Sequence, residues 1–77
     1  MTNRPRPGTF VVLKMVPQGL LSGLPDVDQE AIRAIVGQAV LLVEYDDSGR
    51  AELEFKDSEG TIHSVWVDPI YISPAAP

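Results

Sequence analysis

The side chains best suited to chemistry lie in the second half of the chain. His63 is the only histidine, and Glu44, Glu52 and Glu54 precede it. A histidine among carboxylates can ligate a metal ion, and two close carboxylates can act as general acid and base. The glycines are too scattered for a phosphate-binding loop and lack a following Lys-Ser or Lys-Thr. Which of these side chains meet depends on the strands that carry them.

A run of three strands within residues 39–72 must position these side chains. From Arg50 to Lys56, apolar and charged residues alternate strictly, which predicts a strand with one buried and one wet face. Residues 46–49 and 57–60 flank this strand, each with Asp first and Gly fourth. That pattern is typical of a type I turn that closes a hairpin through a G1 bulge. The sequence therefore predicts a meander of two hairpins.

The turns also predict which side chains share a face, because Asp46 should pair with Arg50 and Asp57 with Thr61. One face then carries Leu41, Val43, Tyr45, Ala51, Leu53, Phe55, His63, Val65 and Val67. The other face carries Val40, Leu42, Glu44, Glu52, Glu54, Ile62, Ser64 and Trp66. A four-residue second loop is the alternative, and its one-residue slip would turn Ile62, Ser64 and Trp66 inward.

This register argues against both kinds of chemistry. His63 lies on the opposite face from Glu52 and Glu54, so we interpret it as a partly buried histidine at the rim of the core, and we expect neither a metal nor another cofactor. Glu44, Glu52 and Glu54 lie close together, yet nothing in the sequence supplies a pocket that would raise a carboxyl pKa. We therefore expect that the protein is not an enzyme.

Before the meander, the pattern predicts one strand and one helix. Thr9 to Val16 is rich in β-branched residues, with Val11, Leu13 and Met15 able to face the core. A loop with three leucines follows and must be buried against the sheet. Residues 26–37 read as the one helix, whose apolar stripe is Val27, Ala31, Ile32, Ile35 and Val36. Asp26 or Asp28 should cap it and Gly37 should end it.

Length and composition bound the organisation of the chain. With 77 residues there is room for one domain and a small core. We expect a flexible arm over residues 1–7, one domain over 8–73 and a tail over 74–77. The chain has no cysteine, no apolar run that would cross a bilayer and no apolar leader at its start, which indicates a cytoplasmic protein that does not contact membranes.

The net charge of −5 lies in one part of the chain. Residues 44–59 hold seven acidic side chains against Arg50 and Lys56. Nucleic acid binding needs clustered cations that displace counterions, so we exclude a nucleic acid partner. A solvated, solubilising surface is the simplest interpretation of the acidic run.

The order of the elements resembles that of SH3-like barrels. Val67 to Ile72, with Trp66 before them, resembles the closing W-x-P-x-x-Y-V stretch of SH3 domains, although Tyr71 follows Pro69 by two residues rather than three. The run from Glu52 to Gly60 is similar to the E-F-x-D-x-x-G core of small bacterial SH3-like barrels. The resemblance implies a mainly β, five-stranded antiparallel barrel with one helix inserted between the first two strands. An open α+β sheet with the helix across one face is the alternative.

Two function classes follow. The first is a small protein-interaction module or accessory subunit, a monomer or weak homodimer, that binds a protein partner through Trp66, Tyr71, Pro69, Glu44, Glu52 and Glu54. The resemblance to peptide-binding SH3 domains implies the contacts of Trp66, Pro69 and Tyr71. The second is an acidic inhibitor or immunity-type protein that blocks a basic site on a partner, and it would also use Asp57. Trp66 decides between two expectations: either the helix covers its face, or that face is left for a partner.

Overall fold

The computed structural model describes residues 4–75, so the predicted arm and tail lie partly outside the described residues. The described elements follow the predicted order, a strand and a helix before the meander. They are β1 (Phe10–Leu13), α1 (Asp26–Ala34), β2 (Ala39–Tyr45), β3 (Ala51–Lys56), β4 (Ile62–Val67), the 3₁₀ helix η1 (Pro69–Tyr71) and β5 (Ile72–Pro74).

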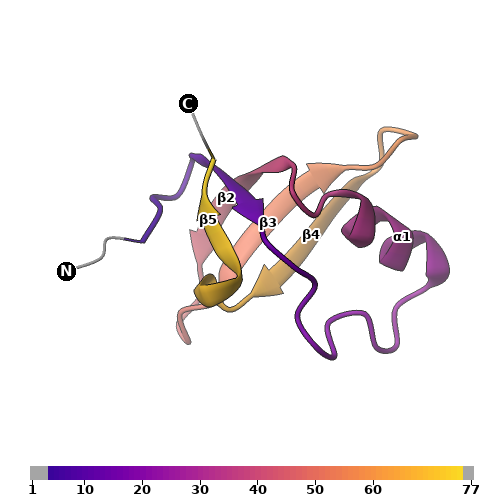
Figure 1. Cartoon of the computed structure of the whole chain (residues 1–77), viewed down its shortest axis with the longest axis horizontal. Helices are drawn as coiled ribbons and strands as arrows, with labels where there is room; N and C mark the ends of the chain where they lie inside the picture. Colours follow the sequence, from indigo (N-terminus) through magenta and orange to yellow (C-terminus); the bar gives the residue numbers. More distant parts are fainter. Residues whose placement is uncertain (1–3, 76–77) are drawn as a thin grey trace.

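The fold is mainly β, with five antiparallel strands in one sheet. The strand order is β4-β3-β2-β1-β5, so each hairpin of the meander contributes neighbouring strands and β1 lies between β2 and β5. In the hydrogen-bond pattern of the described residues the sheet is open, with β4 and β5 as its edges. Figure 1 shows α1 at one end of the molecule and both termini at the other.

The two predicted turns set the register at both hairpins. The Asp46 N–H donates to the Arg50 carbonyl, and the Asp57 N–H donates to the Thr61 carbonyl, each over 2.9 Å. Strand β4 then pairs with β3 as expected, with Leu53 opposite Val65 along its centre. The three-residue second loop is therefore confirmed over the four-residue alternative.

A β-bulge at Val43 changes the predicted faces of β2. Glu44 pairs with Glu52, yet the next pair is Leu42 with Leu53, so Val43 is an extra residue. The predicted faces of Val40 to Val43 are therefore wrong: Val40 and Leu42 are buried, and the two residues predicted to face inward are only half-buried. The sequence could not show this, because both faces of β2 are apolar and the pattern leaves the register open.

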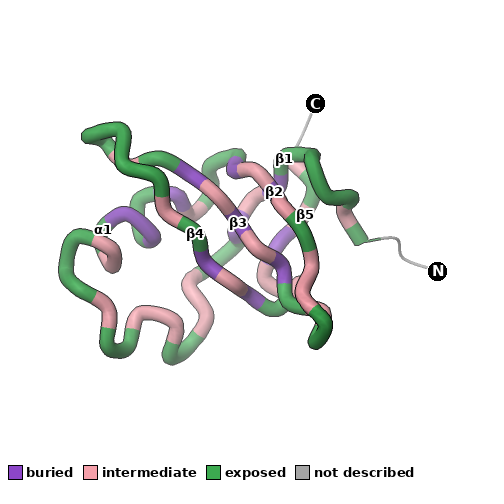
Figure 2. Tube along the Cα trace, turned by 180° about the vertical axis from the view of Figure 1, so that it is seen from behind, coloured by how far each residue is buried: buried purple, intermediate pink, exposed green. Residues whose placement is uncertain are grey.

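The core lies on one face of the curled sheet. Figure 2 shows buried and half-buried positions alternating along β3, as its sequence predicts. Val11 and Leu13 of β1 are fully buried, but Met15 is 54% exposed, which contradicts its predicted place in the core. Strand β1 pairs with β2 only as far as Val12, opposite Ala39, so the chain at Met15 has left the sheet. The loop leucines pack against the core as expected.

Helix α1 packs against the core from one end of the sheet. Its residues Ala31 and Ile32, with the following Ile35, belong to the same buried cluster as the inward side chains of β3 and β4. Val27, the predicted start of the apolar stripe, is instead 66% exposed. The helix therefore does not cover the face of Trp66, contrary to one of the two expectations.

Both helix termini differ from the prediction. Pro25 occupies the N-cap position without a side-chain cap, so the predicted Asp cap is wrong. The Pro25 carbonyl accepts the first N–H groups of the helix, from Asp28 at 3.0 Å and Gln29 at 3.1 Å. At the other end, the helix stops at Ala34 with Ile35 as its C-cap, so the predicted helix over 26–37 is too long. Gly37 has φ of +83° and its N–H donates to the Leu13 carbonyl, in the turn that leads into β2.

Residues 4–7 contact the end of β2. The Arg4 guanidinium carbon lies 3.9 Å from the centre of the Tyr45 ring, and the Tyr45 hydroxyl donates to the Pro5 carbonyl over 2.7 Å. Burial raises the pKa of Tyr45, while the Arg4 charge opposes that rise.

None of the helices in the described chain combines the length and the apolar character that a membrane crossing requires.

Candidate functional site

The outer face of the sheet, which α1 leaves uncovered, carries most of the predicted site. Glu44 pairs with Glu52, and Glu52 pairs with Trp66, so these three residues form one row across β2, β3 and β4. We call them the outer-face row. Neighbouring residues in such a row have Cβ atoms about 5 Å apart. The predicted acidic and aromatic side chains therefore come together here.

Trp66 occupies the position that its register predicts. It alternates with Val65 and Val67, which are buried, and is itself half-buried and outside the core cluster. Its indole is thus partly open to solvent on the same face as Glu52. Trp66 is the only tryptophan of the chain, so its fluorescence reports directly on this face.

Pro69 and Tyr71, which were expected to bind a partner together with Trp66, both lie in η1. Asp68 accepts the Ile70 N–H over 3.0 Å and Pro69 opens the helix, which fixes the turn. Tyr71 is half-buried against the core cluster. Within residues 4–75 the stacked aromatic pair is Phe55 with His63 rather than Trp66 with Tyr71. The sequence analysis overlooked Ile70, which is 69% exposed beside this turn.

Glu54 lies in a different row from Glu44 and Glu52. It pairs with Leu41 on one side and Ser64 on the other, and Leu41 in turn pairs with Phe10. Phe10 is 58% exposed. Glu54 therefore belongs to the half of the outer face nearest α1, beside an exposed aromatic ring that the sequence analysis did not single out.

His63 forms a connection that the sequence analysis missed. Its Nε2 lies 2.8 Å from a carboxylate oxygen of Asp57, and its Nδ1 lies 3.2 Å from a carboxylate oxygen of Asp28. The ring stacks on Phe55, with centroids 5.6 Å apart, and the side chain is only 11% exposed. We call Asp28, His63 and Asp57 the His63 bridge.

The His63 bridge explains the state of one carboxyl group. The His63 hydrogen bond, followed by the Thr61 N–H, lowers the pKa of Asp57. In the other turn, partial desolvation acts to raise the pKa of Asp46, but hydrogen bonds from Arg50 and Ser48 outweigh it and the pKa is lowered. Both turn aspartates therefore remain ionised at neutral pH, and both are committed to holding their turns.

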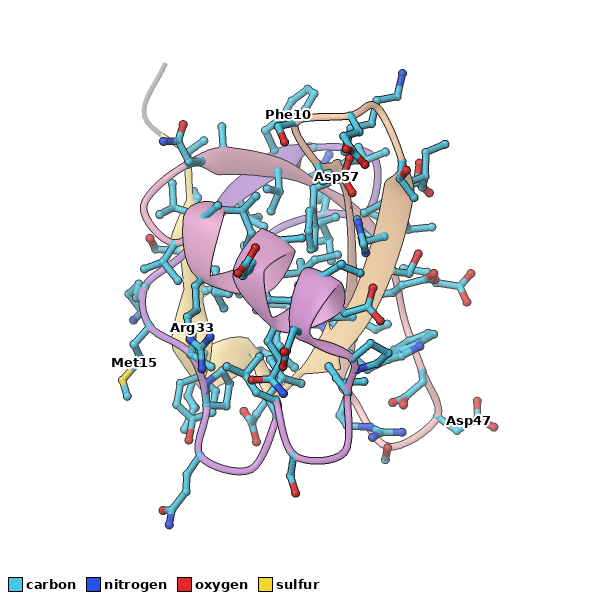
Figure 3. The ribbon with its side chains drawn as sticks, turned by 90° about the vertical axis from the view of Figure 1, so that its right-hand side faces the viewer. Phe10, Met15, Arg33, Asp47 and Asp57 are labelled. Atoms are coloured by element: carbon cyan, nitrogen blue, oxygen red, sulfur yellow. The ribbon has the colours of Figure 1, made fainter. Side chains whose placement is uncertain are left out.

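A groove of about 870 Å³ lies between α1 and the second hairpin turn. Its apolar lining combines buried core side chains with the exposed Phe10 and Val27. Its charged lining is Glu30, Glu54, Lys56, Asp57 and Glu59. Figure 3 shows Phe10 and Asp57 on the same side of α1, with Asp47 of the first turn far from them. We call this depression the helix groove.

The arrangement limits the chemistry of these side chains. Among residues 4–75, no three histidine or carboxylate side chains gather as metal ligands would. Both nitrogens of His63 already face carboxylates, which leaves neither free to take a proton from a substrate. Glu44 and Glu52 lie on the outer face and do not line the helix groove.

No protein family, curated protein or solved structure matches the chain.

Proposed function

We propose that the protein is a small interaction module that binds a cationic surface of a protein partner through the outer-face row. The observation that carries this proposal is the pairing of Glu44 with Glu52 on a face that α1 leaves uncovered. Like charges directly opposite each other destabilise a strand pair. A Lys or Arg of a partner between the two carboxylates would remove that repulsion.

Trp66 supports the same proposal. It lies next to Glu52 in the row, where a cation held by the carboxylate could also contact the face of the indole. Tryptophan at a partly exposed position is a frequent anchor of protein interfaces. Pro69 and Tyr71, with the exposed Ile70, would extend the contact toward η1, while Glu54 would extend it toward α1.

We also propose that this sheet is part of an SH3-like barrel. The strand order β4-β3-β2-β1-β5 and a 3₁₀ turn before the last strand agree with the SH3-like barrel that the sequence resembles. In that family the segment around the same turn contributes to peptide binding. The agreement supports a binding surface that includes Trp66 and the η1 turn.

An acidic inhibitor or immunity-type protein is the second candidate. It is favoured by the charge of residues 44–59, which hold seven acidic side chains against two cations. The negative electrostatic potential of such a protein would attract a basic partner over a distance. Added salt screens this attraction, so the association rate would fall steeply. A module anchored by Trp66 would instead keep its on-rate and lose affinity through faster dissociation when the indole is removed.

The test compares the affinity of wild type and matched variants for a partner protein captured from the source organism. The purified partner is titrated into the protein while Trp66 fluorescence is followed, and affinity is compared for wild type, Trp66→Ala, Glu44→Lys and Asp47→Lys. We expect Trp66→Ala and Glu44→Lys each to weaken binding roughly 30-fold or more, as interface anchors do. Asp47→Lys makes the same charge change outside the row and should have little effect.

Two results would contradict the proposal. Unchanged affinity of the Trp66→Ala variant would remove the row from the interface. Equal losses for Glu44→Lys and Asp47→Lys would show that only net charge matters, which favours the inhibitor. Both variants change exposed residues, and their circular dichroism spectra check that the sheet is intact.

A further inference from the structure

We propose that the helix groove is a second binding site, which takes a short segment of a partner protein carrying an apolar side chain between Lys or Arg residues. This site lies at the α1 end of the molecule and goes beyond the outer-face row.

The groove has an apolar surface that the fold leaves unfilled. Phe10 is 58% exposed and Val27 is 66% exposed, and both line it. Large apolar side chains at two sides of one depression are a usual sign of a binding site, because single exposed residues elsewhere do not create a shared surface. The depression suits an aliphatic or aromatic side chain in contact with both.

The charge around this apolar surface specifies the flanks of the ligand. Glu30, Glu54 and Glu59 line the groove, and within residues 4–75 none of them forms an ion pair. Lys56 is the single cation of the lining, and Asp57 is already occupied by His63. The unpaired carboxylates therefore favour a segment with cations on both sides of its apolar side chain.

The His63 bridge connects the two walls of the groove. One wall is α1, which carries Asp28, and the other is the second hairpin turn, which carries Asp57. His63 contacts both carboxylates from β4 and does not itself line the groove. It is therefore a positioning residue, which holds the walls at a fixed separation. A groove that is already rigid loses less conformational entropy on binding than a flexible one, and so binds its ligand more tightly.

The test uses two capped pentapeptide amides, Lys-Leu-Lys-Leu-Lys and Lys-Ser-Lys-Ser-Lys, with ¹⁵N-labelled full-length protein. We expect the leucine peptide to shift the amide signals of groove residues such as Ala34, Gln38 and Leu41 in a saturable way at millimolar concentration. The serine peptide has the same charge and should give weak, non-saturating shifts. Shifts centred on Trp66 would support the outer-face row and overturn the groove.

Two pairs of matched variants locate the site. Val27→Lys places a cation in the groove, whereas Met15→Lys makes the same kind of change at a residue 54% exposed outside it. Glu59→Lys reverses a groove charge, whereas Asp47→Lys reverses one in the other turn. We expect the groove variants to weaken the leucine peptide roughly tenfold and the controls to leave it unchanged. Equal effects within either pair would overturn the proposal.

The positioning role has its own readout. His63→Phe can keep the stack on Phe55 but has no ring nitrogen for either carboxylate. We expect it to weaken the leucine peptide while the pattern of shifted amides stays the same, and to speed hydrogen exchange in α1. Unchanged affinity for the leucine peptide together with faster hydrogen exchange in α1 would show that the His63 bridge does not position the walls of the groove for binding.

Discussion

The two hairpin turns of the meander have the same local chemistry. In the first, the Asp46 carboxylate accepts the N–H groups of Ser48 at 3.0 Å and Arg50 at 2.8 Å. In the second, the Asp57 carboxylate accepts those of Glu59 and Thr61, both at 2.9 Å. The glycine that ends each turn has φ of +86° or +84°. The positions of Asp and Gly are thus sufficient to form either turn.

The turns differ in what the second carboxylate oxygen contacts. Asp46 pairs over 2.9 Å with Arg50, four residues away in the chain and 58% exposed at its side chain. Asp57 pairs with His63, which is 11% exposed and also contacts Asp28 of α1. One turn is therefore self-contained, and the other is fastened to a distant element. The same sequence signal has a local consequence in one place and a tertiary one in the other.

Replacing the side chain that pairs with each turn aspartate, His63 for Asp57 and Arg50 for Asp46, should give the largest difference in stability between the two turns. We expect His63→Ala to lower the free energy of unfolding by about 2 kcal/mol, because it removes the hydrogen bond to Asp57, the close contact with the Asp28 carboxylate and the stack on Phe55. Arg50→Ala should cost about 0.5 kcal/mol or less, since its ion pair is exposed. Urea unfolding of both variants measures the two costs. Equal costs would mean that the His63 bridge contributes no more than a surface pair.

Replacing the glycines tests the shared half of the comparison. Gly49→Ala and Gly60→Ala should each cost about 1 kcal/mol, because an L-residue is strained at positive φ. Nothing lies within 4 Å of an added Cβ at either position, so no clash adds to that cost. Asn substitutions, which tolerate this conformation better, serve as controls and should cost less. A much larger loss for Gly60→Ala would show that the second turn is already strained by its link to α1.

The parts of the fold that follow local rules could be predicted from the sequence. The alternation along β3 and the Asp and Gly positions were sufficient for both hairpins and for the register of β4, including the outward side of Trp66. The bulge at Val43 could not be predicted, because either face of β2 satisfies the apolar pattern. Its effect was to bury Leu42 in place of its neighbours.

The candidate sites depend on contacts between distant residues and were predicted less completely. The acidic residues Glu44 and Glu52 were expected on one face and lie there, since their register follows from the turns. The His63 bridge and the helix groove require the position of α1 over the sheet. Locally, the position of Asp28 in the first turn of the helix indicates only a possible cap, as that of Asp26 does.

The smallest effect concerns the titration of the two turn aspartates. His63 is the first cause of the lowered pKa of Asp57, so His63→Ala should raise that pKa toward its ordinary value. The lowered pKa of Asp46 depends on Arg50 and Ser48, which the substitution does not touch, and should stay where it is. Carboxyl ¹³C shifts followed from pH 2 to 6 would measure both groups in one sample.

The lowered carboxyl pKa values also make stability depend on pH, and this dependence should differ between the wild type and the His63→Ala variant. A carboxyl group whose pKa is lower in the folded than in the unfolded state stabilises the fold above its unfolded pKa, about 4, and loses that contribution as pH falls through its folded pKa. In the wild type both Asp46 and Asp57 make this contribution. In the His63→Ala variant the part from Asp57 shrinks, so urea midpoints should fall less steeply with acidification below pH 4. An Asp57 pKa that does not move would show that the turn N–H groups alone ionise it, and the two turns would then be alike in their electrostatics as well as in their geometry.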